Sequence, residues 1–209
     1  MKIKFNILLL FSFLLSFNSK DILIELNEID SWILIDKQAN DKKIYEYKND
    51  YSGNKYLQIV QPINLNNNLM FSTIKDISNY NLIISNKNLY SKLVSTDNDT
   101  LSGYQLIENS IPLIRDRQYI FKMFQVSENR IDWYILDKEH QFLDKYVNKN
   151  IRTLSLGAGS WQIDYLGDER VLIYKMFIDD EVNLPNILIQ KIKIKHTVDI
   201  FNDFLEYLK

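Results

Sequence analysis

The stretch Gly159-Ser160-Trp161-Gln162-Ile163, followed by Val171-Leu172-Ile173-Tyr174-Lys175-Met176-Phe177-Ile178, decides the fold of this chain. Large apolar residues recur at every second position of both segments, which is typical of strands with one buried face. Asp179-Asp180 and Leu184-Pro185 come next, and an apolar-rich segment then extends to Lys209. Two strands, an entry marked by proline and one closing helix predict a curved sheet that grips a helix. Such a sheet can hold an apolar cavity beneath it.

Composition limits the function classes. The 209 residues fit one domain, and 46% hydrophobic and 13% aromatic residues provide a substantial core, which excludes disorder for the bulk of the chain. A net charge of -2 gives no general attraction to nucleic acid, so we expect no such partner. Cysteine is absent, which excludes disulfides, a cysteine nucleophile and cysteine-ligated metals.

The N-terminus has the pattern of a secretory signal peptide. Lys2 and Lys4 precede an apolar run over 7–17, and polar residues follow. The run is short for a membrane span, which needs about 20 apolar residues. We therefore predict a signal peptide at 1–19, a mature domain at 20–209, and a protein that is exported, either periplasmic or secreted. The alternative is a hydrophobic segment that stays in the fold.

The remaining chain predicts an α+β fold dominated by antiparallel pairing. The apolar spacing favours a first helix ending near Lys37. It also favours a second helix that is capped within Asn66-Asn67-Asn68 and ends near Ser78. Residues 80–92 are predicted to be irregular or weakly helical. Strands are predicted at 43–47, 55–63, 101–109, 117–126, 130–137, 150–156, 160–166 and 170–178.

The C-terminal segment supports two interpretations. Residues 187–194 alternate like a strand, whereas a longer apolar stripe recurs at helical spacing. The longer pattern favours a helix over about 184–208, with Pro185 in its first turn. The stripe consists of Ile187, Ile194, Val198, Phe201, Leu205 and Leu208.

Strand alternation also predicts which side chains face inward. A packed core is the simplest use of such residues, but a curved sheet over one helix leaves volume, and pockets have apolar walls with a few polar groups. Arg117 either anchors a ligand or pairs with Asp116 or another carboxylate at the strand end. The predicted inner residues are Arg117, Tyr119, Phe121, Met123, Trp133, Trp161, Tyr174 and Met176.

Several short motifs resemble those of START-like (helix-grip, StAR-related lipid-transfer) domains, in order over residues 31–208. The family's opening helix and first strand resemble Trp32 and Ile44-Tyr45. A later strand of the family is similar to Pro112 with Arg117-Gln118-Tyr119-Ile120-Phe121, and its G-x-W motif is similar to Gly159-Ser160-Trp161. Asp179 and Leu184-Pro185 stand where the family has its last turn, here without Pro-Gly-Gly. The resemblance is to a divergent, exported member.

The resemblance implies a curved antiparallel sheet wrapped around a long C-terminal helix, with an internal tunnel and that helix as a lid contacting ligand through Leu188 and Ile192. It implies binding or transfer of a lipid or other hydrophobic small molecule by a monomer in transient contact with a membrane, without catalysis, metal or cofactor. His140 and His196 stand alone and form no metal motif. One alternative is a cyclase- or aromatase-like enzyme, for which only Arg117, Tyr119 and Tyr174 would be available. The other is a structural envelope protein with a filled core.

Overall fold

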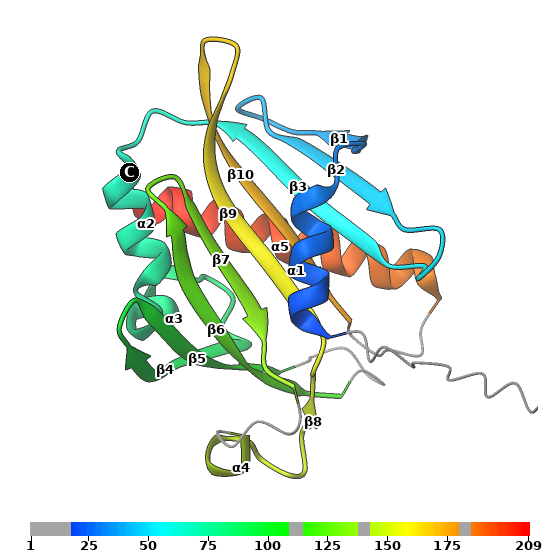
Figure 1. Cartoon of the computed structure of the whole chain (residues 1–209), viewed down its shortest axis with the longest axis vertical. Coiled ribbons are helices and arrows are strands. Elements are labelled where there is room, and N and C mark those ends of the chain that lie inside the picture. Colours follow the sequence, from blue (N-terminus) through cyan, green and yellow to red (C-terminus); the bar gives the residue numbers. More distant parts are fainter. Residues whose placement is uncertain (1–17, 109–114, 138–142, 180–184) are drawn as a thin grey trace, which may run out of the picture.

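A computed structural model describes residues 18–108, 115–137, 143–179 and 185–209. One curved sheet separates two helical layers: α1 (Ser19–Glu28) covers one face, and α5 (Asn186–Tyr207) crosses the other (Figure 1). The predicted apolar run at 7–17, Pro112, His140 and the turn residues 180–184 lie outside the described residues.

The sheet has ten strands, and their spatial order is β1-β2-β3-β10-β9-β7-β6-β5-β4. All pairs along this path are antiparallel, while β8 pairs with β6 in parallel. The strands are β1 (Ile33–Lys37), β2 (Lys43–Lys48), β3 (Lys55–Pro62), β4 (Leu89–Asp97), β5 (Thr100–Ile107), β6 (Arg117–Ser127), β7 (Arg130–Ile135), β8 (Arg152–Thr153), β9 (Gly157–Leu166) and β10 (Glu169–Ile178). The shorter helices are α2 (Asn67–Lys75), a 3-10 turn (Ile77–Asn79), α3 (Tyr80–Ile83) and α4 (Leu143–Tyr146).

Helix α1 begins at a capping box. The Asn18 side chain accepts from the backbone N–H of Lys20 and Asp21, and the Asp21 carboxylate accepts from Asn18 N–H at 3.0 Å. The helix buries one apolar side on the outer face of the sheet, where Ile22, Leu26 and Phe177 share a cluster. This layer closes the face that points away from α5.

Helix α5 packs against the inner face through Val198, Phe201, Phe204 and Leu205, all buried. Other contacts fix its position at both ends: Lys193 Nζ donates to the Ile178 carbonyl at 2.6 Å, and Asp203 accepts from the backbone N–H of Ser85 at 2.8 Å. The long C-terminal helix and the curved antiparallel sheet predicted from the sequence are therefore confirmed. Pro185 is the N-cap residue of α5.

The alternation of faces also agrees with the prediction over most of the sheet. Phe121, Trp133 and Trp161 face the inner cluster. Ile120 on β6 and Ala158 on β9 point to the opposite face of the sheet and pack in outer clusters. Tyr165 shares the face of β9 that carries Trp161, but it is 64% exposed because the β9–β10 hairpin extends beyond the cover of α5 (Figure 1).

Three predicted boundaries are wrong. The first helix ends at Glu28, and 33–37 form the edge strand β1, because three consecutive bulky apolar residues also suit a strand and β2 offers them a pairing edge. Part of the segment predicted as irregular begins β4, an edge strand bonded on one side, whose polar residues gave no strand signal. The second helix ends at Lys75 and continues as a 3-10 turn.

Candidate ligand-binding cavity

A cavity of about 100 Å³ lies between the inner face of the sheet and α5. It is bounded by five strands of the sheet, by α3 and the residue after it, and by one side of α5. Its lining consists of Tyr80, Ile84, Gln105, Ile107, Tyr119, Phe121, Met123, Trp133, Trp161, Tyr174, Met176, Ile178, Lys193, His196, Thr197, Ile200 and Phe204.

Aromatic rings form the apolar wall. Trp161 stacks on Tyr174 with ring centroids 3.9 Å apart and planes at 15°, and Phe204 meets the Trp161 ring edge-on at 5.4 Å. Tyr80 meets Phe204 and donates its hydroxyl proton to the Ile74 carbonyl. Burial raises the pKa of Tyr80 and of Tyr174, so both phenols stay neutral.

Gly159 makes room for the Trp133 indole across the strand pair β7–β9. The two residues are directly opposed, and a Cβ added at Gly159 would lie 2.4 Å from Trp133 Nε1. Any side chain at position 159 would displace this indole. The glycine of the Gly-Ser-Trp motif therefore sets the position of a cavity-lining ring, in addition to continuing the strand.

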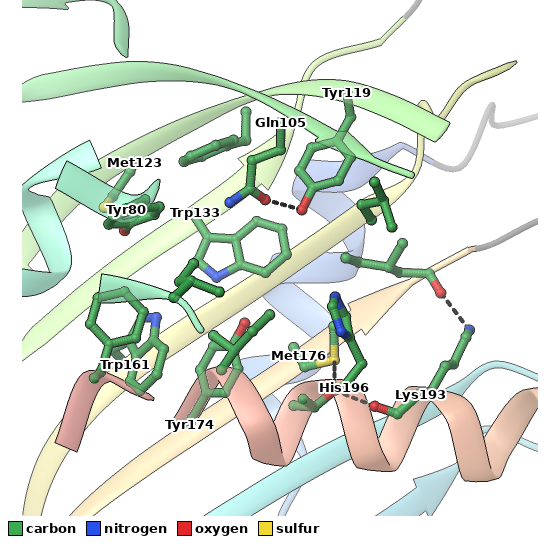
Figure 2. A pocket seen from close by; sticks show the side chains of 17 residues that line it. Tyr80, Gln105, Tyr119, Met123, Trp133, Trp161, Tyr174, Met176, Lys193 and His196 are labelled. Carbon is green, nitrogen blue, oxygen red and sulfur yellow. Dashed lines mark hydrogen bonds between the residues drawn. The ribbon is translucent and has the colours of Figure 1, made fainter. Parts of the chain in front are cut away.

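A short polar chain crosses the opposite wall. Tyr119 donates its hydroxyl proton to Gln105 Oε1 (Figure 2). Gln105 Nε2 in turn donates to the Ser91 hydroxyl at 3.0 Å. Burial raises the pKa of Tyr119 well above its usual value. The chain satisfies these polar groups inside the sheet and leaves the wall uncharged.

The side of the cavity formed by α5 is more polar. Thr197 donates to the Lys193 carbonyl at 2.7 Å, and its hydroxyl lies 3.4 Å from Met176 Sδ. Burial lowers the pKa of Lys193 to about 8, with Asp179 opposing the shift. Burial also lowers the pKa of His196, so the imidazole is neutral at pH 7. In Figure 2 the imidazole rises from α5 beside Met176.

Seven of the ten predicted site residues line this cavity: Tyr119, Phe121, Met123, Trp133, Trp161, Tyr174 and Met176. Arg117 does not. It is 9% exposed at the first position of β6, where burial and nearby Arg152 lower its pKa and Asp179 opposes them. Leu188 and Ile192 also lie outside the lining, because they are on a different side of α5 from the residues that face the cavity.

Sequence reasoning missed the α5 residues of the lining. Lys193, His196, Thr197, Ile200 and Phe204 are spaced i, i+3, i+4, i+7 and i+11, which places them on one side of a helix. This side lies next to the apolar stripe used for the prediction, about 100° around the helix. The spacing was available in the sequence, but a stripe chosen only for apolar residues passes over lysine, histidine and threonine.

Within the part of the chain that the structure describes, no group of three or more histidine or acidic side chains could hold a metal ion. Across the same residues, no helix is long and apolar enough to span a membrane.

The curved antiparallel sheet with α5 across its inner face is the architecture of a helix-grip domain, and several solved structures are similar to it. A STAR-related lipid transfer protein from Xanthomonas axonopodis superposes with a TM-score of 0.70 at 11% identity, covering 86% of this chain and 99% of that one. Human StAR-related lipid transfer protein 5 gives 0.67 at 8% identity, with 91% and 92% covered. The Zhui aromatase/cyclase from Streptomyces sp. R1128 gives 0.53 at 9% identity, with 73% and 92% covered.

No protein-family model and no curated protein sequence matches the chain. At these identities the structural likeness shows the fold alone: the chain has the START helix-grip fold.

Proposed function

We propose that this protein binds a hydrophobic small molecule in the cavity between the sheet and α5, without catalysing a reaction on it. The observation that carries the proposal is the lining itself, in which aromatic rings, aliphatic side chains and methionines surround a few polar groups. The similar lipid transfer proteins support the same kind of ligand.

The cavity volume limits the size of this ligand. Pockets that hold drug-sized ligands measure about 300–1,000 Å³, whereas this cavity measures about 100 Å³. It accommodates a compact apolar molecule or one segment of a longer one. We propose that a complete lipid enters only when α5 moves away from the sheet, as the lid function requires.

The enzyme alternative has weaker support. The similar aromatase/cyclase shares the fold, but of the three candidate residues Arg117 lies outside the lining, and burial raises the pKa values of the Tyr119 and Tyr174 phenols. Neither acts as a general base near neutral pH. A structural protein with a filled core remains the third reading, and it predicts that no ligand binds.

Tryptophan fluorescence separates an open cavity from a filled core, because the three tryptophans lie on two faces of the sheet. Trp133 and Trp161 line the cavity, whereas Trp32 packs in the outer cluster beneath α1. Titration with N-phenyl-1-naphthylamine, a neutral probe that absorbs where tryptophan emits, is expected to quench the emission saturably. Trp133→Phe should reduce the quenched fraction of the emission, whereas the matched control Trp32→Phe, which removes a tryptophan outside the cavity, should increase it.

A cavity-filling pair tests the location independently. Ile200→Phe adds volume to the lining and is expected to weaken probe binding at least about tenfold, because overpacked side chains leave no room. Ile187→Phe makes the same substitution on the same helix at a position that is 74% exposed, and should leave binding unchanged. Absence of saturable binding to the folded wild type would falsify the proposal.

We also propose that the protein is exported and acts in the cell envelope, where a hydrophobic cargo needs a carrier. The support is the sequence pattern of residues 1–17. The structure bears on the cut, because Asn18 caps α1 and the Ser19 hydroxyl, which is buried, donates to Ser155 and accepts from Gly157 N–H.

Cleavage after Ser19 would remove this cap and these bonds, which are worth about 1 kcal/mol each. We therefore move the expected cut to the bond after Ser16, the nearest small residue that leaves Asn18 and Ser19 in the mature chain. N-terminal sequencing of the native protein is expected to start at Phe17. A start at Met1 would contradict export, and a start at Lys20 would restore the original boundary.

A further inference from the structure

His196 lines the cavity and carries a buried polar atom without a hydrogen-bond partner. Six buried side-chain atoms in the described part of the chain lack such a partner, and His196 is the one residue among their owners that lines the cavity; its atom is Nε2. A buried donor or acceptor without a partner costs free energy, of the order of a lost hydrogen bond. A lone atom of this kind in a ligand cavity points to a partner supplied by the ligand.

The neighbouring asparagine fixes the chemical character of that atom. Asn86 Oδ1 accepts from the backbone N–H of Asn88 at 3.0 Å, which orients the amide so that Asn86 Nδ2 faces His196 Nδ1 at 3.4 Å. An amide nitrogen can only donate, so Nδ1 accepts. In the neutral imidazole the proton therefore resides on Nε2, and Nε2 is a donor.

Other polar groups of the lining already have partners within the protein. The Tyr119 hydroxyl donates to Gln105, the Thr197 hydroxyl donates to the Lys193 carbonyl, and Lys193 Nζ donates to the Ile178 carbonyl. His196 lies on α5, two helical turns from Phe204 and the aromatic wall.

We propose that His196 is a polar subsite, and that the ligand is an apolar molecule carrying one hydrogen-bond acceptor oxygen, which receives the Nε2 proton. This inference rests on the proposed function and narrows its ligand class from any hydrophobe to a carbonyl- or ether-bearing one. The recognition is that of a neutral donor for an oxygen, and it requires no charge on the ligand.

Cumene and acetophenone test the proposal, since they have the same shape except for a carbonyl oxygen in place of a methyl group. Calorimetric titration of the full chain is expected to give a dissociation constant about tenfold lower for acetophenone, the range of one net hydrogen bond. His196→Phe removes the donor, and the preference for acetophenone, expressed as the ratio of the cumene to the acetophenone dissociation constant, should fall to one or below. His196→Gln keeps an N–H donor and should retain part of it, while Lys195→Met, an exposed change on the same helix, should leave the preference intact.

The outcomes distinguish this inference from the proposed function. If cumene binds and acetophenone binds no better, or if the preference survives in His196→Phe, the subsite is wrong while the cavity function stands. If neither compound binds the folded wild type, both proposals fail. Should His196→Phe not fold, His196→Leu provides the same comparison without a ring.

Discussion

Replacing Phe201 with alanine is expected to lower the free energy of unfolding by about 3–5 kcal/mol, the usual cost of removing a fully buried phenylalanine. The side chain is 0% exposed, and its ring lies parallel to Trp161 at 5.9 Å, with Lys42 Nζ 5.8 Å from its centroid on the ring face. The loss would leave a void where α5 meets the sheet. Denaturant unfolding followed by circular dichroism measures the change.

Tyr207→Ala is the matched control. Tyr207 lies on the same helix but is 54% exposed, so the substitution is expected to change stability by less than about 0.5 kcal/mol. A Phe201→Ala protein as stable as the wild type would mean that α5 contributes little to the core. The proposed lid would then be held against the sheet by weak packing.

The strongest patterns in the sequence predicted the centre of the fold. Strands β6, β7, β9 and β10 each place large side chains on alternate positions, and they form the middle of the sheet, where one face meets α5 and the residue pattern is strict. The edges were harder to predict. Strands β1 and β4 are bonded on one side, so the choice between helix, loop and strand depends on a neighbour that the local sequence does not show.

The candidate site was predictable to a similar extent. Alternation gave the sheet side of the cavity, because period two assigns a face to every residue. Alternation does not predict where along a strand the cavity ends. Arg117 shares a face of β6 with Tyr119, but it lies beyond the end of the cavity. The His196 subsite depends on Asn86, 110 residues earlier in the chain, and contacts of that kind follow from the fold alone.

The second large effect concerns Lys193, whose burial lowers its pKa from 10.5 to about 8. Between these two pKa values the unfolded chain binds more protons than the folded protein, so the free energy of unfolding increases with pH. Below pH 8 the folded protein carries a buried charge on Lys193 and is destabilised by the full amount. A shift of that size corresponds to about 3 kcal/mol. Lys193→Met removes this cost together with the charge.

We therefore compare the free energy of unfolding of Lys193→Met with that of the wild type, by urea unfolding at pH 7 and at pH 11. The difference between the two proteins is expected to favour the variant by about 3 kcal/mol more at pH 7 than at pH 11. The pH dependence is the diagnostic quantity, because the hydrogen bond to the Ile178 carbonyl is lost at every pH. Lys195→Met is the control: that ammonium is exposed, Asp199 raises its pKa, and no such gain is expected. A Lys193→Met advantage that stays constant from pH 7 to 11 would show that Lys193 titrates as it does in water. The α5 side of the cavity would then be open to solvent, and a ligand would meet a hydrated ammonium there instead of a buried one.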